Sequence, residues 1–319
     1  MKKIFALLLT FVMMLGITAC SNPQQDAEPT EPVEAAFTAI TFTDDLGREV
    51  CIEKQPARVA TLIGSFADIW CLAGGKDTLV ATADDSWTSF DLGLSDDVVN
   101  TGGIKEPNFE MLMSAEPDFV IASCNTEADV ELQGRFEELG IDVAYFDIQN
   151  FDDYLNMLKI CTELTGCPEN YKQYGEDVAE VVDAAIARKD GSAPTVLCIR
   201  ATGSSCKVKG SVDNVLGEML ADLGCVNVAD NDNSLLENLS IEAIIEADPD
   251  YIFAVLQGSD SSDAQKVLED TLLSNPAWGT LTAVKENRFI VLDNSLYNLK
   301  PNSRWGIAYE NLADILFGK

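Results

Sequence analysis

The sequence predicts an α/β protein made of two lobes that are joined by one long helix, with a ligand cleft between the lobes. Three observations support this fold class. Short apolar runs typical of buried strands alternate with helical patterns along most of the chain. A single long helical pattern divides this series into two blocks. Each block also contains the same short motif, a glutamate followed seven residues later by Pro-Asp.

The dividing helix is expected over residues 167–191. Pro168 suits the first helical turn, and Gly191 suits the position just beyond the end. Gly175 lies inside the pattern, where a glycine costs about 1 kcal/mol relative to alanine. At 1.5 Å per residue the helix would be roughly 35 Å long, and we interpret it as a rigid spine. The apolar residues that recur at steps of three and four are Tyr171, Tyr174, Val178, Val181, Val182, Ala185 and Ile186.

Residues 1–20 have the features of a lipoprotein signal peptide. Two lysines precede an apolar run, residues 4–16, that is too short for a comfortable bilayer span. The run leads into Ile-Thr-Ala-Cys, which looks like a bacterial lipobox, so Cys20 is expected to carry lipid and to hold the protein on the outer face of the cell membrane. The alternative is a weak transmembrane anchor with an incidental cysteine. Residues 21–36 are rich in Pro, Glu, Gln and Ala and are expected to form a disordered tether.

Residues 37–166 form the first expected lobe. The apolar run at 58–63 is the kind of strand that is buried on both faces of a parallel sheet, and Gly64 and Ser65 turn it into a helix. Residues 84–88 are expected to be a polar loop. Further strands are expected at 79–81, 118–122 and 141–146, and helices at 66–73, 108–115, before Leu139, and 151–165.

Residues 192–319 form the second expected lobe and repeat this alternation. Ser211 is expected to cap a helix that ends at Leu223. Strands are expected at 195–199, 225–228, 250–255 and 288–292, and further helices at 241–247, 261–273 and 303–317.

The composition excludes several classes of function. A net charge of −32 argues against nucleic-acid binding, because phosphate backbones need a basic surface. The chain has no histidine, which removes His-based triads and His-containing metal sites. No Gly-rich segment has the ending of a phosphate loop, and carboxylates are too frequent for acidic pairs to be informative. The sequence therefore indicates no catalytic residues, no protein-held metal and no cofactor.

The cysteines permit two interpretations. Besides Cys20 there are eight, an even number that would suit disulfides in an exported protein. Cys71, Cys198 and Cys225, however, lie inside apolar patterns, where a free thiol behaves as a small hydrophobic group. We expect mostly buried thiols.

The candidate ligand site follows from the predicted sheets. Parallel α/β sheets bind ligands beyond the carboxyl ends of their strands, and two such edges would face each other across the central helix. Arg200 follows a predicted strand, and Arg304 opens a predicted helix at the same rim. Several cations near one edge of so acidic a chain indicate an anionic or oxygen-rich ligand, although Lys207 could equally be an ordinary solvated charge. The candidate ligand-binding residues, including possible aromatic walls, are Ser65, Trp87, Asn125, Arg200, Lys207, Tyr297, Lys300, Arg304 and Trp305.

Six segments resemble one protein family in order and spacing. They are Asp45–Val50, Pro56–Ala60, Pro107–Glu110, Glu116–Val120, Ala247–Ile252 and Trp278–Val291. Together they resemble the substrate-binding lipoprotein of an ABC importer for ferric siderophores, cobalamin or haem, a class III periplasmic binding protein. The resemblance covers essentially the whole chain after Cys20. It implies two Rossmann-like lobes joined by a single long spine helix, little hinge bending, and lipid anchoring outside the cytoplasmic membrane.

The ligand stays open within that family. A ferric siderophore would best explain the cations, whereas a corrinoid such as cobalamin or cobinamide would depend more on the aromatic residues. Haem would need a Tyr or Met ligand, for which Tyr297 is the nearest candidate. A different class of function, a sensory or surface-interaction lipoprotein with the same fold, is the alternative to transport.

Glu110 and Glu242 occupy corresponding places in the two blocks. Each falls in the first turn of a predicted helix behind a probable cap, Asn108 or Ser240. The helix dipole stabilises a glutamate there by about 0.3–1 kcal/mol, which would explain either residue alone. The pair resembles the glutamates that, in this family, dock into arginine pockets on the two permease subunits. The resemblance therefore implies an ABC importer permease dimer as the partner.

Overall fold

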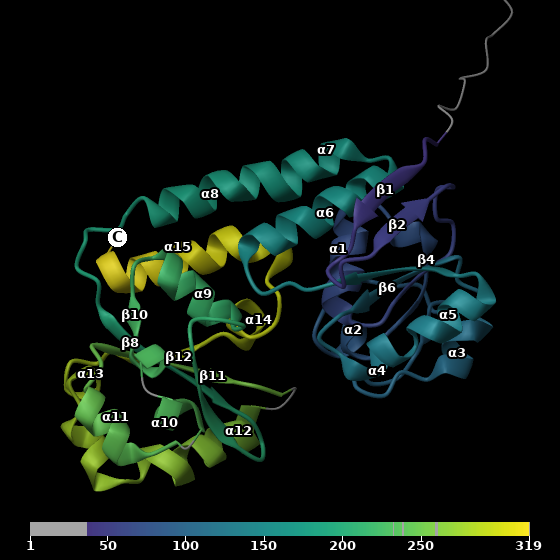
Figure 1. Ribbon diagram of the computed structural model, residues 1–319. Helices are drawn as coiled ribbons and strands as arrows, with labels where there is room; N and C mark the ends of the chain where they lie inside the picture. The colour runs from purple at the N-terminus through teal and green to yellow at the C-terminus, as the bar shows by residue number, and fades with distance from the viewer. Residues whose placement is uncertain (1–36, 232, 238, 259–260, 319) are drawn as a thin grey trace, which may run out of the picture. The chain divides into compact units, whose positions relative to one another are not determined.

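Two five-stranded sheets, each flanked by helices, form the fold of the described residues (Figure 1). The computed structural model describes residues 37–318 apart from 232, 238, 259 and 260. The expected signal peptide, Cys20 and the tether lie in residues 1–36, outside the described residues. We call each sheet with its helices a lobe, the first and the second in chain order. The mixture of parallel sheets and covering helices confirms the predicted α/β fold class.

The first sheet is parallel throughout. In spatial order its strands are β5 (Val99–Asn100), β4 (Leu79–Thr82), β3 (Val59–Thr61), β6 (Phe119–Ser123) and β7 (Asp142–Phe146). The central strands β3 and β6 are buried along their whole length, which is why their sequences lack polar alternation. The strand order reverses between β3 and β6. In open α/β sheets such a reversal creates a crevice at the carboxyl ends of the strands.

Short helices and one hairpin complete the first lobe. The hairpin of β1 (Ile40–Thr43) and β2 (Glu49–Ile52) has a turn held by Asp44, which accepts the backbone N–H of Arg48 at 2.9 Å and pairs with its guanidinium at 2.6 Å. The helices are α1 (Gly64–Leu72), η1 (Lys76–Thr78), α2 (Asp85–Thr88), α3 (Phe109–Ser114), α4 (Glu127–Glu131) and α5 (Gln133–Leu139).

The second sheet has four parallel strands and one antiparallel strand. In spatial order the parallel strands are β10 (Val226–Asn227), β8 (Thr195–Ala201), β11 (Tyr251–Leu256) and β12 (Phe289–Leu292). β9 (Cys206–Lys209) pairs antiparallel with the carboxyl-terminal half of β8. Strand order reverses between β8 and β11, so this lobe has its own crevice position. Its helices are α9 (Val215–Asp222), η3 (Val228–Asn231), α10 (Asn233–Glu237), α11 (Ile241–Ala247), α12 (Ser261–Leu268), η4 (Glu269–Leu273), η5 (Pro276–Thr280), α13 (Thr282–Lys285) and α14 (Asn294–Tyr297).

The segment between the lobes is helical, with a π turn in its middle. It comprises α7 (Pro168–Tyr171), the π turn η2 (Lys172–Glu176) and α8 (Asp177–Ile186). Gly175 lies in the π turn, where a Cβ atom would stand 3.1 Å from the Tyr171 ring. The close packing of the Tyr171 ring therefore explains why residue 175 is a glycine, although glycine is unfavourable in a helix. α8 ends at Ile186, about one turn before Asp190, so the predicted end of the helix just before Gly191 is wrong.

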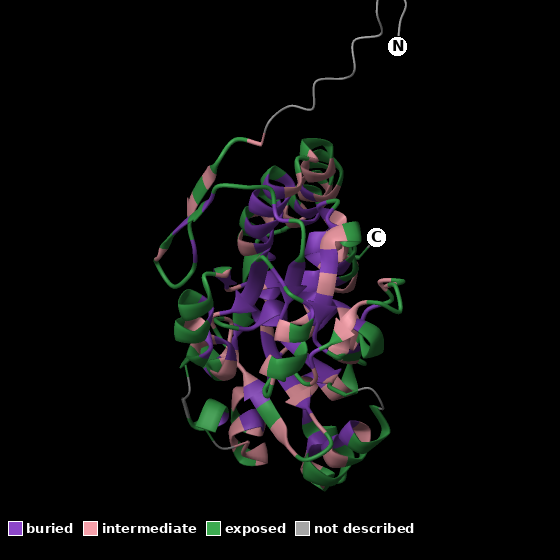
Figure 2. Ribbon diagram, turned by 90° about the vertical axis from the view of Figure 1, so that its right-hand side faces the viewer, coloured by how far each residue is buried: buried purple, intermediate pink, exposed green. Residues whose placement is uncertain are grey.

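Long helices connect the cores of the two lobes. α6 (Phe151–Thr165) precedes α7, and α15 (Trp305–Phe317), preceded by η6 (Asn302–Arg304), packs along α8 (Figure 1). Gly306 permits this close approach, since a Cβ atom there would lie 2.9 Å from the Cβ of Val181. One continuous hydrophobic cluster joins side chains of both sheets with those of α6, α8 and α15. Buried residues gather in the strands and on the inward sides of these helices, as Figure 2 shows.

The structure also corrects several predicted elements. Residues 84–88 are not a loop, because α2 makes one helical turn there. Asn214, and not Ser211, precedes the helix α9. The strand β9 was missed, although Cys206–Lys209 alternates in burial as a half-exposed strand does. By contrast, α6 and α11 have the predicted bounds.

Both lobes repeat one helix-to-strand connection. After α3 and after α11 the chain passes through a non-glycine residue with positive φ, Glu116 at +48° or Asp248 at +37°, and then Pro-Asp. The aspartate accepts hydrogen bonds from the start of the neighbouring central strand: Asp118 from the N–H of Arg58 at 3.0 Å, and Asp250 from the N–H of Thr195 at 2.8 Å. This connection gives a structural cause for the repeated spacing in the sequence.

Candidate ligand-binding site

A pocket of about 220 Å³ lies where the crevice positions of the two lobes meet. Ile63 and Ser65 follow β3, Arg200 lies near the end of β8, and Gln257 directly follows β11. The pocket thus lies at the carboxyl ends of β3, β8 and β11, a position at which parallel α/β sheets bind ligands. The complete lining is Ile63, Ser65, Asp85, Phe90, Ile104, Gln149, Arg200, Asp213, Asn214, Val215, Gln257, Asn298, Leu299 and Lys300.

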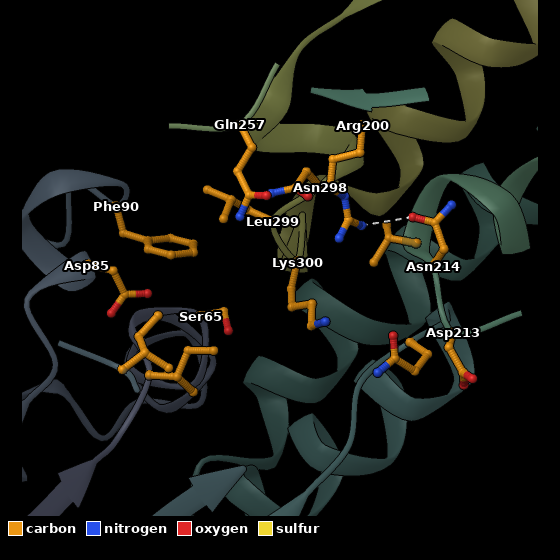
Figure 3. A pocket seen from close by; sticks show the side chains of 14 residues that line it. Ser65, Asp85, Phe90, Arg200, Asp213, Asn214, Gln257, Asn298, Leu299 and Lys300 are labelled. Carbon is orange, nitrogen blue, oxygen red and sulfur yellow. Dashed lines mark hydrogen bonds between the residues drawn. The ribbon is translucent and has the colours of Figure 1, made fainter. Parts of the chain in front are cut away.

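Two cations line the pocket from the second lobe. Arg200 is held in place by its Nη2, which donates to Oδ1 of Asn214 at 3.0 Å (Figure 3). Burial lowers the pKa of Arg200. Burial also lowers the pKa of Lys300, and the nearby positive charge of Arg200 lowers it further, against the opposing effect of Asp147. Two partly desolvated cations near each other are stabilised by an anion placed between them.

The wall from the first lobe is different in character. Asp85 accepts the backbone N–H of Gly64 at 2.8 Å, and burial raises the pKa of this carboxyl group to about 6. The hydroxyl of Ser65 is buried and has no hydrogen-bond partner among the described residues. Phe90 and Ile104 add an apolar surface. This side of the pocket therefore offers acceptors and apolar area.

Of the nine predicted ligand-binding residues, Ser65, Arg200 and Lys300 line the pocket. Arg200 lies inside β8, one residue before its end, where the sequence analysis placed it just after the strand. Lys207 stands directly opposite Arg200 in the pairing of β8 with β9, but it is exposed and lies outside the lining.

Two predicted aromatic walls belong to the hydrophobic core. Trp305 is 0% exposed and packs against Phe151 and Tyr309, with ring centroids 5.9 and 6.2 Å away. Tyr297 is 2% exposed, and its hydroxyl donates to the carbonyl of Ala308 at 3.0 Å. Both residues were expected as possible aromatic walls of the cleft, but the structure buries their side chains in the core.

The remaining three predicted residues lie near the pocket but do not line it. Trp87, on α2, is 42% exposed. Asn125 donates to Asp147 at 2.5 Å and lines a neighbouring groove. Arg304 donates to the Oγ of Ser295 at 3.2 Å and is not part of the lining.

Three polar residues of the lining were not predicted from the sequence: Asp85, Asn214 and Gln257. Gln257 follows β11 directly, so the rule that selected Arg200 would also have found it. Asn214 is visible only once the true start of α9 is known. Asp85 reaches the site through its contact with Gly64, which is distant in sequence, and no local pattern signals such a contact.

A buried asparagine connects the two walls. The side-chain amide of Asn302, which lies beyond Lys300 in the second lobe, donates to the carbonyl of Ser65 at 2.9 Å and to Oδ2 of Asp68 at 2.8 Å. Asn302 is 0% exposed and has φ +52°. The segments that line the pocket from opposite lobes are therefore bonded directly beside it.

Glu110 and Glu242 are both exposed. Asn108 caps α3, accepting the N–H of Met111 at 3.0 Å, and Ser240 caps α11, accepting the N–H of Ala243 at 3.3 Å. A hydrogen bond from its own backbone N–H lowers the pKa of Glu242, and the hydroxyl of Ser240, which donates to its carboxylate at 2.9 Å, lowers it further. Neither glutamate is needed as the cap itself.

The described residues hold no candidate metal site and no candidate membrane span. No group of three or more His, Cys, Asp or Glu side chains there is placed to hold a metal ion. No helix in the described part of the chain has the length and apolar character needed to span a bilayer. The eight cysteines of residues 37–318 are free thiols in the structure.

Comparison with known proteins identifies the class. Residues 59–296 match the periplasmic binding protein family. The Fe(3+)-citrate-binding protein YfmC of Bacillus subtilis is 27% identical over 304 residues, covering 93% of this chain and 91% of YfmC. A cobalamin-binding protein of Halobacterium salinarum is 24% identical, covering 89% and 79%. The structure of S. aureus IsdE complexed with heme has a TM-score of 0.65 at 17% identity, covering 82% and 98%.

The family match, the two lobes and the pocket between them define one class of protein. The chain belongs to the periplasmic binding protein family and is a substrate-binding protein of the kind that serves ABC transporters, and not an enzyme. This result confirms the resemblance seen in the sequence motifs.

Proposed function

We propose that the protein captures an anionic metal chelate, best a ferric siderophore or a ferric carboxylate complex, and delivers it to an ABC importer. The observation that carries this proposal is the pair of partly desolvated cations, Arg200 and Lys300, in the pocket. In a chain of net charge −32, cations in a cleft are a specific feature. The relative YfmC, which binds Fe(3+)-citrate, supports an oxygen-rich iron complex.

Haem and corrinoids suit the pocket less well. The pocket lining includes no Tyr, Met or Cys, and the chain has no His, so the lining offers no usual axial ligand for haem iron. Tyr297, the predicted haem ligand, is committed to the core. The large flat face of a corrinoid would favour aromatic walls, but Phe90 is the single aromatic residue in the lining.

The test is a charge-removing double variant, Arg200→Gln with Lys300→Gln, titrated with ferric citrate by quenching of tryptophan fluorescence. Truncating a buried charge contact costs about 2–5 kcal/mol, so affinity should fall about a hundredfold or more. The matched control is Lys207→Gln, which removes an exposed cation on the same side of the sheet and should change affinity less than about fivefold. Preference of the wild-type protein for haemin or cobalamin over ferric chelates would contradict the proposal.

We also propose that Glu110 and Glu242 dock the protein onto the two subunits of a permease dimer. Their repeated spacing follows from the repeated helix-to-strand connection, so spacing alone does not support docking. What supports it is that both side chains are exposed while Asn108 and Ser240 provide the caps. An exposed carboxylate at the start of a corresponding helix in each lobe suits two-point contact with a two-fold partner.

Membrane attachment through a lipidated Cys20 is a further part of the proposal. It rests on the sequence of residues 1–20 and on the relative YvrC of Bacillus subtilis, which is described as an ABC transporter substrate-binding lipoprotein. Lipid on Cys20 would keep the cleft close to the permease on the outer face of the membrane.

A further inference from the structure

The anion-binding position of the first lobe is occupied by the protein itself. In parallel α/β sheets the start of the helix after a central strand usually receives a ligand anion, because its N–H groups are free and its dipole favours negative charge. Here that helix is α1, which begins at Gly64 at the edge of the pocket. The N–H of Gly64 instead donates to Oδ1 of Asp85 at 2.8 Å.

The local structure fixes Asp85 in this position. A Cβ atom on Gly64 would lie 2.9 Å from Cγ of Asp85 and 2.8 Å from the backbone nitrogen of Ser86, so a side chain at residue 64 would not fit. Ser86, the next residue of α2, is buried and bonds the hydroxyl of Thr82 at 2.7 Å, and Thr82 bonds the hydroxyl of Thr61 at 2.7 Å. This chain of hydroxyl groups attaches α2 to the strands β4 and β3.

The two walls of the pocket therefore have opposite charge. Arg200 and Lys300 stand on the second lobe, whereas the Asp85 carboxylate and the unpartnered hydroxyl of Ser65 stand on the first (Figure 3). The remaining charged residue of the lining, Asp213, is exposed at the rim of the second lobe. A ligand that carried negative charge on every side would be repelled by the first wall.

We propose that Asp85 makes the cleft selective for a bipolar chelate. The anionic groups of such a ligand lie against Arg200 and Lys300, and an ammonium or hydroxyl donor on its opposite side faces Asp85 and Ser65. This inference rests on the proposed function and refines it, because it adds a hydrogen-bond donor to the chemistry required of the chelate. Asp85 is then a specificity-determining residue.

The experiment compares wild-type protein with Asp85→Asn using two chelates of different polarity. Asparagine keeps an oxygen for the N–H of Gly64 and removes only the charge. The probes are ferric citrate, which is anionic, and ferrioxamine B, a ferric hydroxamate with a free ammonium group. Loss of the nearby negative charge should raise the affinity for ferric citrate about tenfold and lower the affinity for ferrioxamine B about tenfold. The matched control is Asp84→Asn, an exposed neighbour outside the lining, which should change neither affinity by more than about twofold.

The possible outcomes separate the inference from the proposed function. Shifts of the same sign for both chelates, or equal shifts in the Asp84 and Asp85 variants, would overturn the role of Asp85 and leave chelate binding intact. Absence of binding of either chelate to wild type and variant at millimolar concentrations would overturn the proposed function and, with it, this inference.

Measuring the same affinities at two pH values tests the role of Asp85 a second time. Burial raises the pKa of this carboxyl to about 6, and the neighbouring Asp84 also raises it. The charged groups across the pocket are Arg200, Lys300 and the rim residue Asp213. Lowering the pH from 8 to 5 should therefore protonate Asp85 and weaken the binding of ferrioxamine B to the wild-type protein. The difference in affinity between wild type and the Asp85→Asn variant should then become smaller. An unchanged difference at the two pH values would contradict the assignment.

Discussion

Replacement of Asn302 tests whether the bond between the pocket walls matters for both stability and binding. Asn302→Ala removes a hydrogen bond to the Asp68 carboxylate, worth about 1.5–3 kcal/mol, and one to the Ser65 carbonyl, worth about 0.5–1.5 kcal/mol. Part of this loss is offset, because the Oδ1 of Asn302 is buried without a partner among the described residues and disappears with the side chain. We expect a net loss of about 2 kcal/mol from the amide.

The positive φ at residue 302 adds a second loss of stability to the alanine variant, which can be measured separately. Asn302 has φ +52°, a conformation that asparagine tolerates and that costs alanine about 1–2 kcal/mol. Asn302→Gly should therefore be about 1 kcal/mol more stable than Asn302→Ala. Asn287 is the matched control, because it has φ +57° but is exposed and its side chain makes no hydrogen bond to the described residues. Asn287→Ala should show the backbone cost alone.

Urea denaturation at constant m-value measures these differences, and titration with ferric citrate shows whether the walls have shifted. Burial raises the pKa of Asp68, so the unpaired carboxylate is less costly at low pH, where it is protonated, and more costly as the pH rises through that pKa. The loss in Asn302→Ala should therefore be smaller in acid than at neutral pH. Equal destabilisation by Asn302→Ala and Asn287→Ala would show that the side-chain amide of Asn302 contributes nothing to stability, contrary to this prediction.

The remaining predictions concern the partner and the membrane. The double variant Glu110→Ala with Glu242→Ala should bind ferric citrate normally and lose chelate uptake in cells, whereas Glu163→Ala with Glu180→Ala, two exposed glutamates of α6 and α8, should keep uptake. Full uptake by the first pair at wild-type expression would exclude docking through these residues. Cys20→Ala should move the protein from the membrane to the soluble extracytoplasmic fraction, and retention after carbonate washing would contradict lipid attachment.

Much of the fold follows from local sequence patterns. α6 could be predicted to the residue because Asn150 caps it with a capping box and Gly166 ends it in a left-handed conformation. The buried parallel strands appear as apolar runs, and the crevice rule then leads to Ser65 and Arg200. These features are determined by short segments of sequence, so they can be predicted without knowing which distant residues are in contact.

The parts that failed depend on tertiary contacts. Trp305 and Tyr297 are core residues because α15 packs against α6 and α8, which the order of polar and aromatic residues does not reveal. Asp85 lines the pocket because Gly64 lets α2 approach α1. The π turn at Gly175 likewise depends on close contact with Tyr171 and with α6. In the sequence, Gly175 appears only as a residue that is unfavourable in a helix.

Chelate binding in the pocket is tested most directly by a crystal structure of the protein with ferric citrate, with iron located by its anomalous scattering. We expect one iron peak in the pocket, with citrate oxygens in hydrogen-bond contact with Arg200 and Lys300 and the metal centre between them and the first-lobe wall. An iron peak outside this pocket, or a chelate that contacts neither cation, would contradict the proposed anion-binding role of Arg200 and Lys300.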